Sequence, residues 1–364
     1  MIDARLAGHS GIGVYLAQLL PRVVPPLAAW RPLVLTRAGQ RDAIAVSLPT
    51  NIDIQTWDVP PLSARCLVST PPYATSSDLL WTPHFNVPLR CAMPLAVTLH
   101  DLLPLTAPAL AGTGRAVPVR WWVRAIRARA RAVLCVSEFT RGEAVRFGAC
   151  DRDEATVTPL GVDPTWFAMP RAETAAAHDP PTIIYVGLLK PHKNVTRLLR
   201  AFAQVRNHIP HRLVLVAHHA RVRNVDREAL ALITQLSDRV ELIDDLPQKD
   251  LVARVQAAAF AVLPSLHEGF GLPALEAMAA GRPVLAGRAG ALPEVCGDAA
   301  LYCDPLSVES IARGLTLLAG DAPLRARLST AGRVRAATFS WDACAALTVA
   351  ALARALAESP RGAA

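Results

Sequence analysis

Residues 260–287, with the sequence FAVLPSLHEGFGLPALEAMAAGRPVLAG, constrain the fold more tightly than any other stretch. The apolar run Phe260–Pro264 has the length of a buried strand, and Pro283–Ala286 predicts the next strand. Between them, Pro273 suits the first position of a helix and Ala274–Ala280 are good helix formers. A strand, a helix and a second strand in this order predict a parallel sheet with a crossover helix.

The loop of this unit brings backbone to the start of the predicted helix at Gly269, Phe270, Gly271 and Leu272. Backbone N–H groups at a helix N-terminus bind phosphate well. Two carboxylates flank the loop, Glu268 within it and Glu276 in the predicted first helical turn. Because a carboxylate repels phosphate but accepts strong hydrogen bonds from a diol, the pattern predicts a nucleotide-sugar site.

The length of 364 residues indicates two domains, since single cores stop growing near about 250–300 residues. Hydrophobic residues make up 52% of the chain, which is enough for two cores. The prolines at 164, 170, 180 and 181 are typical of a linker. We therefore expect an N-terminal domain at 1–165, a linker at 166–181, a C-terminal domain at 182–340, and a last helix with a tail at 341–364.

Strand-like runs alternate with turn-rich or helix-forming segments in both halves, which predicts an α/β fold. In the first half they lie at Pro32–Thr36, Ile52–Trp57, Leu79–Trp81, Leu95–Leu99, Arg131–Val136 and Ala155–Thr158. In the second half they lie at Thr182–Val186, Arg212–Ala217 and Val240–Ile243, besides the two named above, and Asp298–Asp304 is expected to be a further strand with a loop. Helices are expected from Val308 and Pro323, and a final one at Asp342–Ala357.

The formal charge of +8 and the pI of 9.5 indicate an acidic partner, which can be a nucleotide, a lipid surface or a nucleic acid. The seven cysteines form no CxxC pair, which is typical of reduced thiols in a cytoplasmic protein. No apolar run reaches the roughly 18–20 residues that span a bilayer, and Ala343–Ala353 comes nearest. No signal peptide is evident at the N-terminus.

The segment 115–131 holds six arginines and no acid. One helical stripe would carry Arg120, Arg124, Arg127 and Arg131, and the other side Val119, Trp122, Val123 and Ile126. Together with Trp121 and Trp122, the arginines fit contact with an anionic membrane or an anionic acceptor. The alternative is a solvated helix face whose apolar side enters the core.

Polar and glycine residues follow several of the other predicted strands. Gly11 and Gly13 lie in a predicted loop before a helix from Val14, where they serve either a ligand or a tight turn. His84 and His100 each follow a strand end, where open parallel sheets bind ligands, although a structural role is the alternative.

Lys193 precedes a predicted helix for which Asn194 is a candidate N-cap. A lysine there opposes the helix dipole, and a bound diphosphate would remove the conflict. Asp151 and Asp153 match the DxD spacing of metal-dependent sugar transferases, but nothing near them resembles a metal cage, so we expect a surface loop.

Several motifs recur together along the chain. They are Ser10-Gly11-Ile12-Gly13, His100-Asp101, Val136-Ser137-Glu138, Pro159–Asp163, Tyr185-Val186-Gly187, Pro191–Asn194, Pro293-Glu294-Val295, and Glu268–Pro273 with Glu276. With these motifs the chain resembles, over nearly its whole length, the family 4 retaining glycosyltransferases with the GT-B fold.

That resemblance implies an α/β protein with two Rossmann-like domains facing a central cleft, and a C-terminal helix that crosses back to the N-terminal domain. The subgroup most similar to this chain assembles bacterial O-antigen, capsule or exopolysaccharide. It implies retaining transfer of a hexose, with mannose from GDP-mannose as the best match, onto a lipid-linked saccharide. The alternatives are a UDP- or dTDP-sugar donor, giving glucosyl or rhamnosyl transfer, and a non-catalytic membrane-docked partner with the same fold.

The resemblance also implies roles for individual residues. Lys193 would neutralise the diphosphate, Glu268 would bind sugar hydroxyls, Glu276 the ribose diol, and His100 the sugar's C6 hydroxyl. The residues Gly269–Leu272 would offer N–H groups to the donor, and Gly11 and Gly13 would close over phosphate or acceptor. No metal, other cofactor or nucleic-acid partner is implied. The protein would be cytoplasmic, with peripheral contact at the inner face of the cytoplasmic membrane as an option.

Three features depart from the family pattern. Leu188 stands where many relatives have arginine, which would leave phosphate neutralisation to Lys193 with help from Lys190 or His192. His218-His219 stands where glycine is usual. The chain also begins at the end of its first predicted strand, so a truncated start is left open.

Overall fold

The computed structural model describes residues 1–8, 10–61, 63–112, 114, 116–168, 180–218, 225–244 and 246–357. The chain forms two compact units, unit 1 (Met1–Gly161 with Ser340–Ala364) and unit 2 (Val162–Phe339). The division falls after Gly161, ahead of the expected linker at 166–181, most of which lies outside the described residues. The last helix groups with unit 1, so the chain does return to its N-terminal part.

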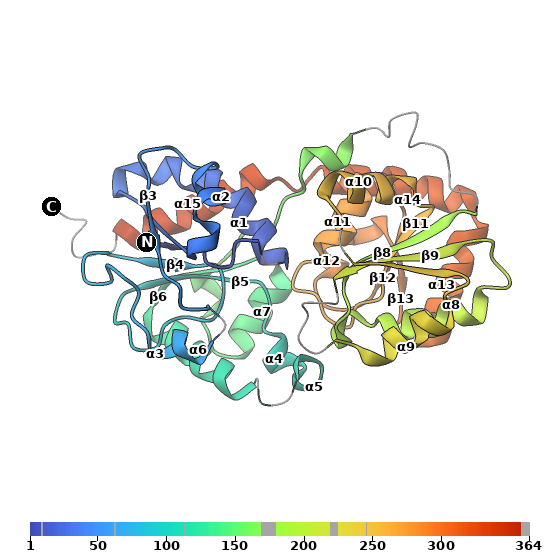
Figure 1. The fold of residues 1–364 in the computed structure, drawn as a ribbon, viewed down its shortest axis with the longest axis horizontal. Coiled ribbons are helices and arrows are strands. Elements are labelled where there is room, and N and C mark those ends of the chain that lie inside the picture. Colours follow the sequence, from blue (N-terminus) through green and yellow to red (C-terminus); the bar gives the residue numbers. More distant parts are fainter. Residues whose placement is uncertain are drawn as a thin grey trace. The chain divides into compact units, whose positions relative to one another are not determined.

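Unit 1 is built on a seven-stranded parallel sheet in the order β3-β2-β1-β4-β5-β6-β7. Figure 1 shows strands β3 to β6 of this sheet with helices around them. Its strands are β1 (Ile2–Asp3), β2 (Leu33–Thr36), β3 (Asp53–Thr56), β4 (Leu80–Thr82), β5 (Leu95–Leu99), β6 (Ala130–Cys135) and β7 (Ala155–Val157). Its α-helices are α1 (Ser10–Val23), α2 (Arg41–Ala45), α3 (Ala64–Val68), α4 (Leu103–Thr106), α5 (Pro108–Ala111), α6 (Ala116–Arg129), α7 (Glu138–Arg146) and α15 (Trp341–Ala357). The 3-10 turns are η1 (Pro25–Trp30), η2 (Ala38–Gln40) and η3 (Arg152–Glu154).

Helix α1 begins earlier than predicted. Gly11 and Gly13 lie within its first turns rather than in a loop before Val14, which corrects the sequence interpretation. A Cβ on Gly13 would stand 2.9 Å from the backbone nitrogen of Gly8, so glycine lets the helix pack tightly on the preceding turn. Gly11 has open space around it, so it remains accessible at the start of the helix.

Helix α15 is an integral part of unit 1, where it packs against α1 and β6. At its start, a Cβ on Gly161 would stand 2.1 Å from the backbone nitrogen of Trp341, so only glycine permits the approach of these two segments. The buried side chains of α15 are Trp341, Cys344, Ala345, Thr348, Ala351, Leu352 and Ala355.

The stretch Ala322–Ala357 is long and apolar enough to cross a membrane by length and composition, with a mean hydropathy of 1.4 in its most apolar window. Core helices pass the same test, and 39% of that window is buried within the protein. The stretch is two helices, α14 (Ala322–Ala336) and α15, rather than one continuous span.

Unit 2 repeats the architecture with a six-stranded parallel sheet in the order β10-β9-β8-β11-β12-β13. Its strands are β8 (Thr182–Leu188), β9 (Arg212–His218), β10 (Val240–Ile243), β11 (Phe260–Leu263), β12 (Val284–Gly287) and β13 (Leu301–Cys303). Its α-helices are α8 (Val195–Val205), α9 (Arg227–Gln235), α10 (Gln248–Ala257), α11 (Leu272–Ala279), α12 (Leu292–Cys296), α13 (Val308–Gly320) and α14 (Ala322–Ala336). The 3-10 turns are η4 (Pro164–Phe167), η5 (Pro191–Lys193) and η6 (Gly297–Ala299).

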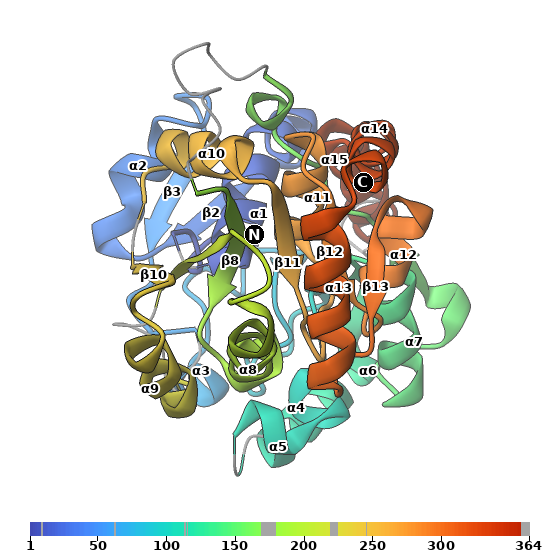
Figure 2. The ribbon, with the colours of Figure 1, turned by 90° about the vertical axis from the view of Figure 1, so that its right-hand side faces the viewer.

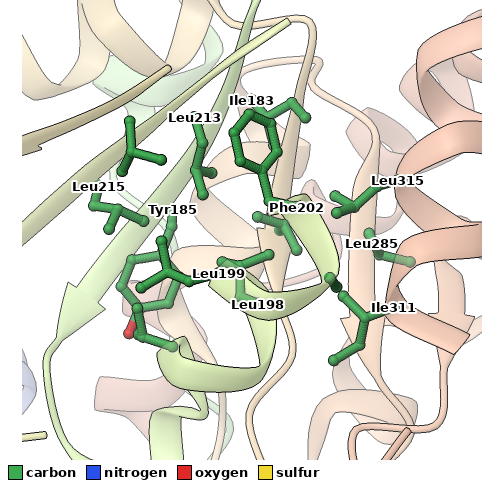
Figure 3. Packing of buried hydrophobic residues seen from close by; sticks show 14 of the residues in the cluster. Ile183, Tyr185, Leu198, Leu199, Phe202, Leu213, Leu215, Leu285, Ile311 and Leu315 are labelled. Carbon is green, nitrogen blue, oxygen red and sulfur yellow. The ribbon is translucent and has the colours of Figure 1, made fainter. Parts of the chain in front are cut away.

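The core of unit 2 lies between its sheet and the helices α8 and α13, which run side by side (Figure 2). Helix α8 buries Leu198, Leu199 and Phe202, whose spacing of three and four residues forms one apolar face. Figure 3 shows this face against Ile183 and Leu213 of the central strands. The packing holds the carboxyl ends of β8 and β11 in place, and the candidate site is built on the loops that follow these two strands.

Both sheets reverse their strand order at one point, between β1 and β4 in unit 1 and between β8 and β11 in unit 2. In open parallel sheets, the loops that leave the two strands at such a point diverge and leave a crevice for ligands. In unit 2 these are the loops that carry Lys193 and Glu268. The fold therefore brings together two residues that stand 75 positions apart in the sequence.

Candidate active site

Lys193 and Glu268 form a buried ion pair at the reversal point of the unit 2 sheet. The Lys193 Nζ lies 2.7 Å from Oε1 and 2.8 Å from Oε2 of Glu268. Only 9% of the Glu268 side chain and 17% of the Lys193 side chain are exposed. Burial opposes ionisation of Glu268, but the charge and hydrogen bonds of Lys193, together with a hydrogen bond from Ser265 and the charge of His192, outweigh it and lower the pKa of this carboxyl below its ordinary value.

Ser265 is a further hydrogen-bond partner of the Glu268 carboxylate. Its Oγ donates a hydrogen bond of 2.7 Å to Oε1 of Glu268. Because Oε1 already accepts from the ammonium, the carboxylate is fixed in one orientation by two side chains from two loops. No sequence motif marked Ser265, since a serine three residues before a glutamate is common in any loop.

Asn194 ties the two loops together, which differs from its predicted role as a helix N-cap. Its backbone is left-handed, with φ of 63°, and its side chain makes no capping bond to α8. Its Nδ2 instead donates to the backbone oxygens of Pro264 at 2.9 Å and Pro305 at 2.6 Å. The buried amide thus fixes the turn η5, and with it Lys193, against the loop that carries Glu268.

The Glu268 backbone is held from the other side by the segment after β12. Its carbonyl accepts a 2.9 Å hydrogen bond from the N–H of Ala291. Gly290 has φ of +59°, and a Cβ there would stand 2.5 Å from the Glu268 oxygen and 2.6 Å from its nitrogen. Glycine is therefore required at position 290 for the loop to take this position.

Helix α11 begins at Leu272, directly after this loop, with Gly271 at its N-cap and Pro273 in its first turn. Pro273 has no N–H, and the Ala274 N–H donates to the Gly271 oxygen at 3.0 Å, so among the described residues the first-turn N–H left for an anion is that of Leu272. Phe270 is 5% exposed and packs edge-on against Phe339, with 5.7 Å between ring centroids. The Phe270 side chain therefore anchors the loop and leaves only its backbone for a ligand.

Glu276 lies beyond the first turn of α11, which corrects the predicted position. Its carboxylate is half-buried, and among the described residues no donor bonds to it. Burial, together with repulsion by Asp163, raises the pKa of Glu276 to about 7. A carboxylate placed at this cost without a partner is one that a ligand with hydroxyl groups would stabilise.

In unit 1, His100 follows β5 and His84 follows β4, as predicted. The His100 ring packs edge-on against Tyr15 of α1, with 4.8 Å between centroids, and its buried Nε2 has no hydrogen-bond partner among the described residues. Burial, with a contribution from His84, lowers the pKa of His100 to about 4. Burial also lowers the pKa of His84 to about 4, so both imidazoles are neutral at pH 7.

The predicted basic helix is α6, and the structure revises which of its residues face outward. Trp122 is 8% exposed and belongs to the core with Val119, Val123 and Ile126, so it is not available to a membrane. Trp121 is 57% exposed. Arg131 lies on strand β6 rather than on the helix, and Arg120 and Arg124 remain on the exposed face.

Arg127 forms ion pairs with the segment that matches the DxD spacing. Its guanidinium lies 2.8 Å from Asp151 and 2.6 Å from Glu154. Asp151 precedes the exposed turn η3, which matches the expected surface loop. Across the described residues, no three histidine, cysteine or carboxylate side chains gather as metal ligands would.

Family models match most of the chain. The model described as "Glycosyl transferases group 1" matches residues 170–335, and the model "Glycosyltransferase Family 4" matches residues 74–166.

Curated relatives and a solved structure extend this match. An O-antigen chain mannosyltransferase B of Escherichia coli is 29% identical over 73% of this chain and 72% of its own length. An MMP alpha-(1->4)-mannosyltransferase of Mycolicibacterium hassiacum is 34% identical over 74% and 67%. A D-inositol 3-phosphate glycosyltransferase of Nocardia farcinica is 31% identical over 87% and 75%. The Anabaena protein HepE, solved in complex with UDP and glucose, has a TM-score of 0.77 with 18% identity over 97% and 98%.

The fold is that of the GT-B glycosyltransferases, so the α/β architecture expected from the sequence is confirmed. The chain belongs to glycosyltransferase family 4 and is a glycosyltransferase. Its curated relatives include mannosyltransferases and inositol-phosphate glycosyltransferases.

Proposed function

We propose that this glycosyltransferase moves a mannosyl group from GDP-mannose, with retention of configuration, onto a lipid-linked saccharide during assembly of a bacterial surface polysaccharide. The buried Lys193–Glu268 ion pair at the reversal point of the unit 2 sheet carries the proposal. The named activities of two relatives, both mannosyltransferases, support the choice of sugar.

The donor would bind to unit 2 through three groups. An ammonium has three N–H donors, so Lys193 can hold Glu268 and still donate to a diphosphate oxygen. The Leu272 N–H at the start of α11 would donate to the same diphosphate, and Glu276 would accept hydrogen bonds from the ribose diol. The ion pair holds the Lys193 ammonium in place before the donor arrives, so little reorganisation is needed on binding.

Glu268 has a different task, because its negative charge lies close to where the donor sugar would sit. An ionised carboxylate there stabilises the positive charge that develops on the sugar as its bond to the diphosphate breaks. Lys193 stabilises the negative charge that develops on the leaving diphosphate. The two residues of the ion pair thus have complementary roles. No protein nucleophile is needed if the acceptor attacks the sugar from the same face that the diphosphate leaves.

The leaving diphosphate would then take the acceptor's proton, so the mechanism we propose is metal-independent. His100, neutral at pH 7, would bind a sugar hydroxyl, and Gly11 at the open start of α1 would let a ligand approach the backbone. A lipid-linked acceptor would bring the protein to the inner face of the cytoplasmic membrane as a peripheral protein. Family membership argues against the non-catalytic alternative.

A donor panel tests the proposal. GDP-mannose, UDP-glucose and dTDP-rhamnose would each be incubated with diphospholipid-linked saccharides, and products would be resolved by mass spectrometry. We expect transfer from GDP-mannose, reduced at least about a hundredfold in Lys193→Ala and Glu268→Ala. Transfer only from the UDP or dTDP donor would refute the sugar assignment, and normal turnover by both variants would refute the site.

A further inference from the structure

Unit 1 contains a second basic site, which we call the arginine pocket. It is a hollow of about 490 Å³ between α6 and the C-terminal end of α7, lined by Arg120, Arg124, Arg127, Arg146, Val123 and Phe147 among others. None of the described residues that line it carries a carboxylate. The pocket lies at the opposite end of the nine-residue helix α7 from Ser137, about 13 Å along the axis, so it is distinct from the strand-end residues His84 and His100.

The charge of the arginine pocket is not balanced by the protein. Arg127 is neutralised by Asp151 and Glu154. Arg120, Arg124 and Arg146 have no ion-pair partner in the part of the chain that the structure describes. Three guanidinium groups around one hollow repel one another, and an anion seated between them would turn this repulsion into attraction.

The surroundings of the pocket are apolar and aromatic rather than polar. Arg124 lies over the ring of Trp121, 5.4 Å from its centroid, and Arg146 lies 5.2 Å from the centroid of Phe147. Trp121 is 57% exposed, and Val117, one helical turn earlier on α6, is 63% exposed. Exposed tryptophan beside arginine is the composition of a helix that lies in the interface of a membrane.

We propose that the arginine pocket binds the phosphate of an anionic phospholipid headgroup, with Trp121 and Val117 entering the lipid interface. The inference rests on the proposed function, because a lipid-linked acceptor requires the enzyme to work at a membrane. A free phosphate would satisfy the three arginines but would leave the exposed tryptophan and valine in water. A lipid satisfies both features, since its charged headgroup and its apolar chains lie next to each other.

Cosedimentation with vesicles tests the pocket. Wild-type protein would be titrated with vesicles of phosphatidylglycerol and phosphatidylcholine, and with phosphatidylcholine alone. Each arginine near an anionic surface strengthens binding about fivefold, so the triple variant Arg120→Gln, Arg124→Gln, Arg146→Gln should bind the anionic vesicles on the order of a hundredfold more weakly. Trp121→Ala should weaken binding to the same vesicles as well.

Two controls match the triple variant. Arg127→Gln changes a pocket residue whose charge is already paired, so vesicle binding should stay within about twofold. A second triple variant neutralises three exposed arginines away from the pocket, Arg41→Gln, Arg313→Gln and Arg327→Gln, with the same change in net charge. Thermal melts establish that all variants are folded.

Three outcomes would overturn the inference: unchanged binding by the pocket triple variant, equal loss in the distant triple variant, or competition by glycerol phosphate without any vesicle binding. Transfer to a water-soluble acceptor separates this inference from the proposed function. The pocket triple variant should lose vesicle binding but keep transfer to the soluble acceptor. If the protein binds vesicles through the pocket but transfers no sugar, the inference about the pocket would stand and the proposed function would be refuted.

Discussion

The substitution Glu276→Gln should make the free protein more stable at pH 8 while it weakens donor binding. Burial and Asp163 raise the pKa of Glu276 from its ordinary value of 4.5 to about 7. A shift of about 2.5 units at about 1.4 kcal/mol per unit means that ionising this carboxyl costs the folded state up to about 3 kcal/mol. Glutamine has the shape of the protonated acid and avoids that cost.

The sign of the pH dependence follows from the same shift. Between pH 4.5 and 7 the folded state holds a proton on Glu276 that the unfolded state has released, so the free energy of unfolding falls as pH rises through this window. The gain from Glu276→Gln should therefore be largest above pH 7 and should shrink to about 1 kcal/mol or less at pH 5.

Differential scanning calorimetry at pH 5, 6, 7 and 8 measures this prediction. For a domain of the size of unit 2, about 3 kcal/mol corresponds to a rise in Tm of about 6–12 °C at pH 8. Titration calorimetry with GDP should show weaker binding by the variant at pH 8. A stability gain that is absent, or that is the same at every pH, would refute the account of Glu276 as an unpaired ligand carboxylate.

Three further predictions concern the residues around the site. Lys193→Met should lower the free energy of unfolding in urea by about 3–5 kcal/mol, because it leaves the buried Glu268 carboxylate without its partner. The double variant Lys193→Met with Glu268→Gln should recover most of that stability without recovering transfer, and a double variant no more stable than the single one would contradict this. Asn194→Gly preserves the left-handed backbone but removes two buried hydrogen bonds, so it should cost about 2–3 kcal/mol, and a loss under about 0.5 kcal/mol would show that the amide does not join the loops. The pKa of His100 lies near 4 in the folded state, below the unfolded value of 6.5, so its contribution to stability is full above pH 6.5 and is lost as pH falls towards 4. The free energy of unfolding of His100→Phe should therefore fall less steeply with acid than that of the wild type, and an identical pH profile would contradict the burial of the ring.

The strand pattern was largely predictable from sequence because apolar runs bounded by turn residues have few other solutions. The strands at Leu95–Leu99 and Val240–Ile243 match β5 and β10 at both ends. The segment Asp298–Asp304, expected to hold a strand and a loop, contains β13, and the turn η6 (Gly297–Ala299) precedes this strand. Short polar segments at strand ends carry no periodicity that would mark such a boundary.

The residues that contact each other across loops were less predictable. The pairing of Lys193 with Glu268 was not read from sequence as a contact, although both were chosen as ligands. Asn194 was assigned a local capping role from its position before a helix, but its buried side chain makes longer-range bonds to Pro264 and Pro305. Local propensity cannot reveal such bonds, because the partners are backbone oxygens distant in the chain.

Helical spacing also predicted too uniform a face for the basic segment. The helical spacing correctly placed Val119 and Trp122 on the core side, and both are buried in α6. The same spacing also placed Arg131 on the helix, but the helix ends at Arg129 and the chain enters β6. Arg146, which the structure adds to this basic surface, comes from another helix and shares no pattern with α6.

The anomeric configuration of the product decides whether the enzyme transfers mannose with retention, as we propose. Proton NMR would follow the reaction of GDP-α-mannose with a saccharide acceptor in the presence of a chelator. We expect an α-linked mannoside, formed without added metal and absent in Glu268→Ala. A β-linked product, or transfer that depends on a divalent cation, would contradict this.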